Sequence, residues 1–156
     1  MAICNPGDLK GILKKGERLL GLDVGTKTIG LALSDTLLMV ATPLKTIRRT
    51  RFKADAAEVF HEVNAHDIGA LVIGLPISLE GRESPRSQSV RQFARSLLEL
   101  RDLPIAFWDE RLSTAAVERT MIEADITRKR RSEIVDRTAA AYILQGLLDR
   151  LAYAAS

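Results

Sequence analysis

Short apolar runs, bounded by glycine and polar residues, predict three strands in the first third of the chain. Residues 18–23 form an apolar run that ends at Asp23, residues 28–34 alternate in polarity, and residues 40–47 form a third run. The glycine-rich stretch between the first two runs predicts a hairpin. Pro43 removes a backbone donor from the third run, so we expect that strand at an edge or an irregular position of the sheet.

After residue 50 the apolar positions recur at the spacing of a helix. The stripe that begins after Ser84 and Pro85 starts with the residue types preferred at an N-cap and at the first helical position. Ser132 is a similar candidate cap for the last helix. Helices are therefore expected at residues 51–64, 85–98, 114–124 and 133–151.

Two short, almost wholly apolar runs at residues 68–73 and 104–108 separate these helices and predict strands that are covered on both faces. Helical connections between strands favour parallel pairing, whereas the opening hairpins are antiparallel. The pattern predicts an α/β fold with a mixed five-stranded sheet and helices on both faces. Ligands of open α/β sheets bind beyond the carboxyl ends of the strands, where Asp23 and Glu110 are expected.

The chain length of 156 residues fits one domain with a single core. We assign residues 17–156 to this domain and residues 1–16, which are mixed and polar, to a peripheral N-terminal extension. No run of about 18 apolar residues and no signal-peptide pattern is present, so we expect a cytoplasmic protein without a membrane partner. The single cysteine, Cys4, cannot form an internal disulfide.

The net charge is only +3, but the basic residues are clustered. Clusters of this kind are typical of proteins that bind a phosphate backbone, although a single cluster is more often solvated surface. The three groups are Arg48, Arg49, Arg51 and Lys53; Arg82, Arg86, Arg91 and Arg95; and Arg128, Lys129, Arg130 and Arg131.

Three acidic residues are candidates for a cation site. Asp23 precedes a glycine turn, Glu110 follows the strand at 104–108, and Asp136 lies near the start of the last expected helix. Asp109 and Glu110 should point to opposite sides of an extended chain, so only one of them can face a common site. Each acid alone also has an ordinary interpretation as a turn residue, a strand end or a helix-terminus acid.

Four stretches carry a resemblance that distinguishes these interpretations. GLDVGTKTIGLALSD, VIGLP, WDERLS and VDRTAAAYILQGLLD, in this order, resemble the bacterial pre-16S rRNA nuclease family, which is also described as a family of Holliday junction resolvases. The resemblance spans about Arg18 to Leu151 and implies a ribonuclease-H-like fold. It also implies that Asp23, Glu110 and Asp136 are catalytic metal ligands for Mg²⁺ or Mn²⁺, cations that prefer oxygen donors.

The implied activity is metal-dependent phosphodiester hydrolysis, with two cations about 4 Å apart in an in-line displacement. We expect the substrate to be structured RNA, namely the 5′ end of pre-16S rRNA in ribosome biogenesis, or branched DNA in recombination and repair. The expected protein is a monomer or a homodimer. Lys27, Arg111 and the basic run are assigned to substrate phosphates; the run comprises Arg128, Lys129, Arg130 and Arg131.

Two alternatives differ in class from a nuclease. A DxG turn that leads into a second strand also occurs in phosphotransferases of the actin and sugar-kinase superfamily, but those enzymes resemble two such domains. The second alternative is a ribosome-assembly or transcription factor that binds nucleic acid without catalysis. The chain also departs from the family pattern where an asparagine and an aspartate are usual before Gly81, because it has Ser78 and Glu80 there.

Overall fold

The computed structural model describes the backbone of residues 3–77, 80–112 and 128–154. Side chains are described in these ranges except at residues 112, 128–137 and 153–154. The predicted helix at 114–124 and the variant loop residue Ser78 lie outside the described residues. No helix within the described ranges is both long and apolar enough to cross a membrane.

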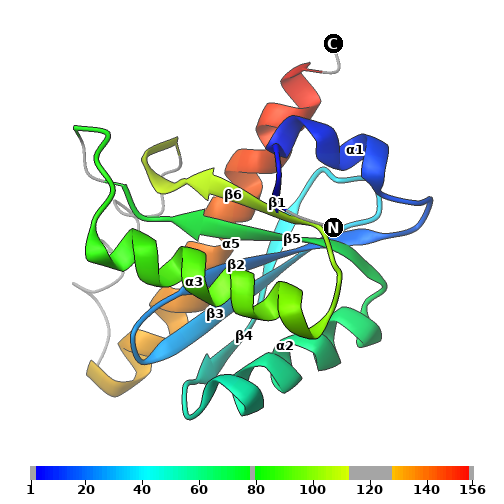
Figure 1. Ribbon diagram of the computed structural model, residues 1–156. Coiled ribbons are helices and arrows are strands. Elements are labelled where there is room, and N and C mark those ends of the chain that lie inside the picture. Colours follow the sequence, from blue (N-terminus) through cyan, green and yellow to red (C-terminus); the bar gives the residue numbers. More distant parts are fainter. Residues whose placement is uncertain (1–2, 78–79, 113–127, 155–156) are drawn as a thin grey trace.

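A mixed sheet forms the centre of the molecule, with the strand order β1-β6-β5-β2-β3-β4 (Figure 1). The β2–β3 and β3–β4 pairs are antiparallel, whereas β2–β5, β5–β6 and β1–β6 are parallel, as the connections predicted. The strands are β1 (Ile3–Cys4), β2 (Arg18–Val24), β3 (Thr28–Ser34), β4 (Ala41–Arg48), β5 (Ile68–Leu75) and β6 (Ile105–Asp109).

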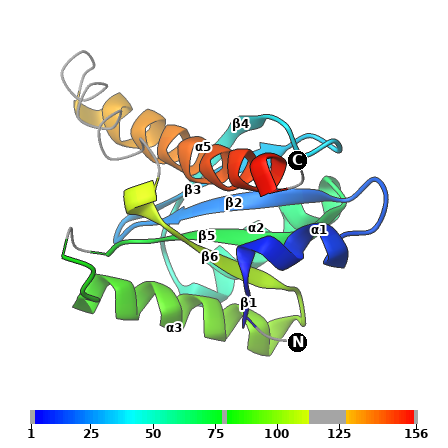
Figure 2. The same cartoon turned by 90° about the horizontal axis from the view of Figure 1, so that it is seen from above.

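Helices cover both faces of the sheet (Figure 2). α2 and α3 pack on one face over Leu22, Ile73 and their neighbours, and α5 packs on the other face over Leu19 and Val72. This arrangement explains why the central strands are almost wholly apolar, since helices pack against both faces of each strand. The helical elements are η1 (Pro6–Asp8), α1 (Leu9–Ile12), α2 (Phe52–Ala65), α3 (Pro85–Leu100), η2 (Glu110–Leu112) and α5 (Arg128–Ala154).

The sheet has six strands and not the predicted five. The additional strand, β1, consists of Ile3 and Cys4 and pairs with Ile105 and Ala106 of β6. Two residues are too few to show a polarity pattern, so this strand could not be predicted from periodicity. The N-terminal segment also buries Leu9 completely, within the core cluster that lies beneath α5.

Of the two predicted helix N-caps, the structure confirms one and contradicts the other. Ser84 caps α3 as expected: its hydroxyl accepts from the Ser87 backbone N–H at 3.3 Å, and Ser87 Oγ accepts from the Ser84 N–H at 2.7 Å. Ser132 is not an N-cap, because α5 begins at Arg128. Lysine and arginine are good helix formers, and the basic run extends the helix backward through Ser132.

The position of Pro43 agrees with its lack of a backbone N–H donor. β4 is an edge strand, and its register against β3 shifts between Leu31, opposite Lys45, and Ala32, opposite Pro43. The irregularity therefore lies where proline cannot donate to the ladder.

A partly buried ion pair joins α2 to this edge strand. Glu62 is 8% exposed and accepts a hydrogen bond from Lys45 Nζ at 3.1 Å, while His66 Nε2 lies 3.1 Å from its second oxygen. Burial raises the pKa of Glu62, but the hydrogen bond from Lys45 and the nearby basic groups outweigh it. The pKa of Glu62 therefore lies below its usual value of 4.5.

We expect Glu62→Gln to lower the free energy of unfolding by up to about 1 kcal/mol at pH 7, since the half-exposed Lys45 is partly screened by solvent. Because the folded-state pKa is depressed, this contribution is complete above the unfolded pKa and is lost as the pH falls through the folded one. Urea unfolding at pH 7 and in acid tests this. The prediction is contradicted if Glu62→Gln still differs from the wild type in its free energy of unfolding in acid. It is also contradicted if Glu58→Gln, at an exposed position of the same helix, has an equal effect.

Candidate active site

Asp23 lies near the carboxyl end of β2, in the middle of the sheet. It is opposite Gly30 of β3, and it is only 2% exposed. On the other side, the parallel register pairs Leu22 with Ile73, so the next positions, Asp23 and Gly74, lie side by side. Alternation along β2 directs Asp23 to the same face as Leu19, which is the face that α5 covers.

Glu110 reaches the same place from β6. It is the first residue of η2, directly after the strand, and its Oε1 lies 3.1 Å from the position that a Cβ on Gly74 would occupy. Ile143 of α5 contacts that position too, with Cδ1 at 2.5 Å. Gly74 is thus a neighbour of both acids, and a side chain there would collide with Ile143 and crowd the Glu110 carboxylate.

Asp109 has a different environment from Glu110. Its carboxylate accepts hydrogen bonds from the backbone N–H of Arg111 at 2.9 Å and from the Arg111 guanidinium, with Nη2 at 2.6 Å. The hydrogen bonds from Arg111 hold the pKa of Asp109 below its usual range. Asp109 therefore orients Arg111, a predicted phosphate contact, whereas the Glu110 carboxylate lies near Gly74.

The side chains of Asp136 and of the four basic residues from Arg128 to Arg131 lie outside the described residues. The backbone places Asp136 one turn before Ala140, whose carbonyl oxygen is 3.2 Å from a Cβ built on Gly21 of β2. The N-terminal half of α5 therefore passes over the strand that carries Asp23. Because α5 begins at Arg128, Asp136 is not in its first turn, and the expected stabilisation by the helix N-terminus does not apply.

Lys27 is exposed in the turn between β2 and β3. The turn is held by Arg49, whose backbone N–H donates to the Lys27 carbonyl at 2.8 Å and whose Nη1 donates to the Gly25 carbonyl at 2.7 Å. Arg49 also lies 3.7 Å from Asp55 and 5.3 Å from the ring centre of Phe93. This arginine, grouped by sequence with a surface cluster, thus fixes the loop that follows Asp23.

Two residues that matter for the geometry were missed as site residues in the sequence. Gly74 could have been recognised as a glycine inside an otherwise apolar strand, which often marks a close approach by another group. Arg49 had no comparable signal, since its contacts depend on how β4 returns beside β3. In the second basic group, Arg91 pairs with Glu83 and lies 5.1 Å from the ring centre of Phe107, so it is not simply solvated.

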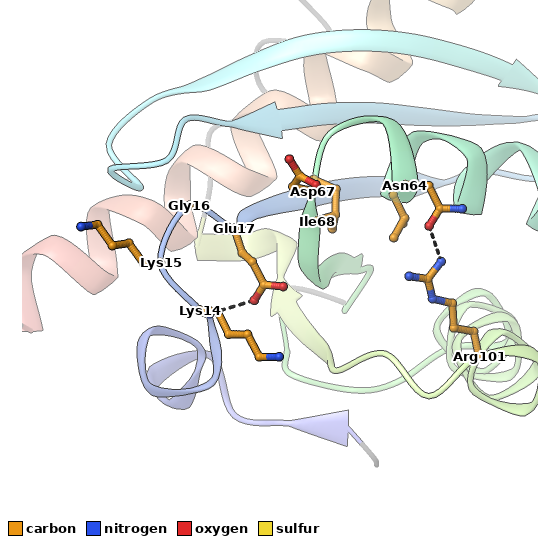
Figure 3. A pocket seen from close by; sticks show the side chains of 9 residues that line it. Lys14, Lys15, Gly16, Glu17, Asn64, Asp67, Ile68 and Arg101 are labelled. Atoms are coloured by element: carbon orange, nitrogen blue, oxygen red, sulfur yellow. Dashed lines mark hydrogen bonds between the residues drawn. The ribbon is translucent and has the colours of Figure 1, made fainter.

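A pocket of about 470 Å³ lies at the amino ends of β2 and β5, at the other end of these strands from Asp23 (Figure 3). Lys14, Glu17 and Arg101 are among its lining residues. Glu17 accepts from the Lys14 backbone N–H at 2.8 Å, and Arg101 donates to Asn64 at 2.7 Å. This pocket is therefore separate from the candidate acids, which lie at the carboxyl ends of the strands.

Among the residues whose side chains are described, no group of three His, Cys, Asp or Glu is close enough to hold a metal. The third predicted ligand, Asp136, lies outside that set. The described part of the site consists of Asp23 and Glu110, both carboxylates, on either side of Gly74.

Comparison with known proteins identifies the family. The model of the RuvX family, described as "Holliday junction resolvase", matches residues 17–150. A protein of Paramagnetospirillum magneticum named "Putative pre-16S rRNA nuclease" is 59% identical over 96% of both chains. A protein of the same name from Rhodospirillum centenum is 58% identical over 97% of this chain and 83% of its own.

Among solved structures, the chain resembles Thermus thermophilus RuvC in complex with a Holliday junction substrate. The TM-score is 0.55 at 13% identity, over 87% of this chain and 96% of that one. At this identity the likeness concerns the fold, and it confirms the predicted ribonuclease-H-like class. Relatives more than 50% identical to the chain are named "Putative pre-16S rRNA nuclease", and the match to the family model shows that the chain belongs to the RuvX family.

Proposed function

We propose that the protein is a metal-dependent nuclease that hydrolyses phosphodiester bonds at the carboxyl ends of β2 and β6. The observation that carries the proposal is the position of the Glu110 carboxylate over Gly74, beside Asp23. The names of the relatives as nucleases, and the family description as a resolvase, support the same class.

The donor set fits a hard divalent cation. Asp23 and Glu110 offer only carboxylate oxygens, the ligands preferred by Mg²⁺ and Mn²⁺, and a side chain at Gly74 would crowd the Glu110 carboxylate. We assign Asp23, Glu110 and Asp136 as ligands and as the catalytic residues. When bound, the cations would lower the pKa of the attacking water and stabilise the leaving oxygen.

The remaining residues act on the nucleic acid. Lys27, exposed on a turn that Arg49 fixes, would contact a phosphate beside the cleaved bond, and Arg111, oriented by Asp109, would contact another. Such contacts give affinity and register without reading bases. The basic run at the start of α5 would extend the contact along the backbone; it comprises Arg128, Lys129, Arg130 and Arg131.

We infer that the substrate is pre-16S rRNA, which the names of relatives more than 50% identical over most of their length contain, and we propose its 5′ end as the part that is processed. Action on this precursor implies a cytoplasmic enzyme. The second candidate is a four-way DNA junction, favoured by the family description. Symmetric cleavage of a junction requires a two-fold dimer, whereas RNA processing also suits a monomer.

The two substrates are separated by direct assay. Purified protein is offered a 5′-extended small-subunit rRNA precursor and a four-way DNA junction, each with Mg²⁺, Mn²⁺ or EDTA, and its mass is measured by light scattering. We expect metal-dependent cleavage of the RNA. Cleavage of the junction alone by a dimeric protein would instead identify the protein as a junction resolvase. Binding without cleavage in the presence of either metal would support a non-catalytic assembly factor.

A further inference from the structure

A second pocket, of about 430 Å³, lies beside the candidate active site but on the outer side of β6. It is enclosed by three parts of the chain that are distant in sequence: residues 5–7 at the start of η1, Trp108 with its neighbours in β6, and Arg150 with Leu151 in α5. η1 contacts both β6 and α5, so these walls belong to one packed unit. Its volume is within the range of small-ligand sites.

The wall formed by β6 consists of a strand edge that β1 covers only in part, together with the side chain of Trp108. β1 pairs only with Ile105 and Ala106, and no other described strand lies along the outer edge of residues 107–109. Trp108 is 5% exposed, and its buried Nε1 has no acceptor within the described part of the chain. Because this Nε1 is shielded from solvent, Trp108 contributes apolar ring surface to the pocket and no accessible donor.

The lining combines apolar surface with one outward-reaching cation. Leu151 is buried, whereas Arg150 is exposed at the rim. Asp109 also lines the pocket, but its carboxylate is neutralised by Arg111 and presents no uncompensated charge to an anion. A nucleotide fits this lining: its planar base would lie between the apolar walls, and its phosphate would bind the Arg150 guanidinium. Arginine binds phosphate through paired donors.

The position of the pocket links it to cleavage. Glu110 follows Trp108 by two residues, and on α5 Arg150 lies seven residues after Ile143, which contacts the same Gly74 position as Glu110. Seven helical residues span about 10 Å. Stacked nucleotides rise about 3.4 Å each, so the pocket is within roughly three nucleotides of the acids.

We propose that this pocket binds the base and phosphate of one nucleotide of the nucleic-acid substrate, near the cleaved bond. The inference rests on the proposed nuclease function for its role, but the binding itself does not require cleavage. It assigns Trp108 and Arg150 to substrate positioning, which no sequence motif indicated.

Trp108 is the only tryptophan in the chain, so its fluorescence reports directly on the pocket. The intact protein in EDTA is titrated with adenosine and uridine 5′-monophosphates, with adenosine, and with inorganic phosphate. We expect a saturable change of emission with a mononucleotide, weaker binding of adenosine, and about tenfold weaker mononucleotide binding in Arg150→Gln. Arg101→Gln, which changes an arginine at the other pocket, is the matched control and should bind like the wild type.

Three results overturn the proposal: no mononucleotide changes the emission at millimolar concentration, Arg150→Gln binds as tightly as the wild type, or inorganic phosphate alone gives the same response. Asp23→Asn separates this proposal from the nuclease function. Loss of cleavage with retained mononucleotide binding supports both, whereas a wild-type protein that cleaves RNA without responding to mononucleotides refutes only the pocket.

Discussion

Glu110→Gln should reduce cleavage by at least about 1,000-fold, whereas the neighbouring Asp109→Asn should retain most of the activity. Glutamine keeps the shape of Glu110 but removes the charge that would hold a cation beside Gly74. Stabilisation by a cation contributes several kcal/mol to such a reaction, and each 1.36 kcal/mol corresponds to a factor of ten in rate. Asp109 instead binds Arg111, at 2.6 Å, and its loss should weaken substrate binding only modestly.

Initial rates of both variants on the RNA precursor, at several concentrations of Mg²⁺, measure this difference. Melting temperatures near that of the wild type would show that neither effect arises from unfolding. Equal loss in the two variants would mean that the pair acts as a unit. Greater loss in Asp109→Asn would reverse the assignment of roles in the WDER motif.

The sequence correctly predicted the strands that are covered by helices on both faces. The boundaries of β3 agree with the predicted run at 28–34, and β5 extends the run at 68–73 by two residues. Those two residues include Gly74, and glycine weakens a strand pattern although here it remains in the ladder opposite Trp108. Periodicity therefore reports which positions are buried, but it does not report where a neighbour requires space.

The sequence could not predict contacts that depend on tertiary register. Asp23 was placed correctly at a strand end by its pattern alone, but its proximity to Glu110 depends on the pairing of β2 with β5 and of β5 with β6. The same holds for Arg49, which reaches the turn after Asp23 from the far end of β4. The catalytic role of Asp136 was assigned only through resemblance, and it stays a prediction.

Gly21→Ala should lower the free energy of unfolding by about 2 kcal/mol, which corresponds to roughly 5 °C in melting temperature. A Cβ at Gly21 would lie 2.9 Å from Leu144 Cβ and 3.2 Å from the Ala140 carbonyl oxygen. Neither atom is the end of a flexible side chain, so α5 must move away from β2 as a whole. Thermal unfolding of the variant measures the cost.

Gly11→Ala is the matched control, because nothing lies within 4 Å of a Cβ at that position in α1, and alanine favours a helix. It should melt at or slightly above the wild-type temperature. Since Asp136 is one turn before Ala140, displacement of α5 should also lower cleavage by Gly21→Ala below the temperature at which it unfolds. A destabilised variant with unchanged cleavage would mean that α5 carries no catalytic group, and the site would then consist of Asp23 and Glu110 without Asp136.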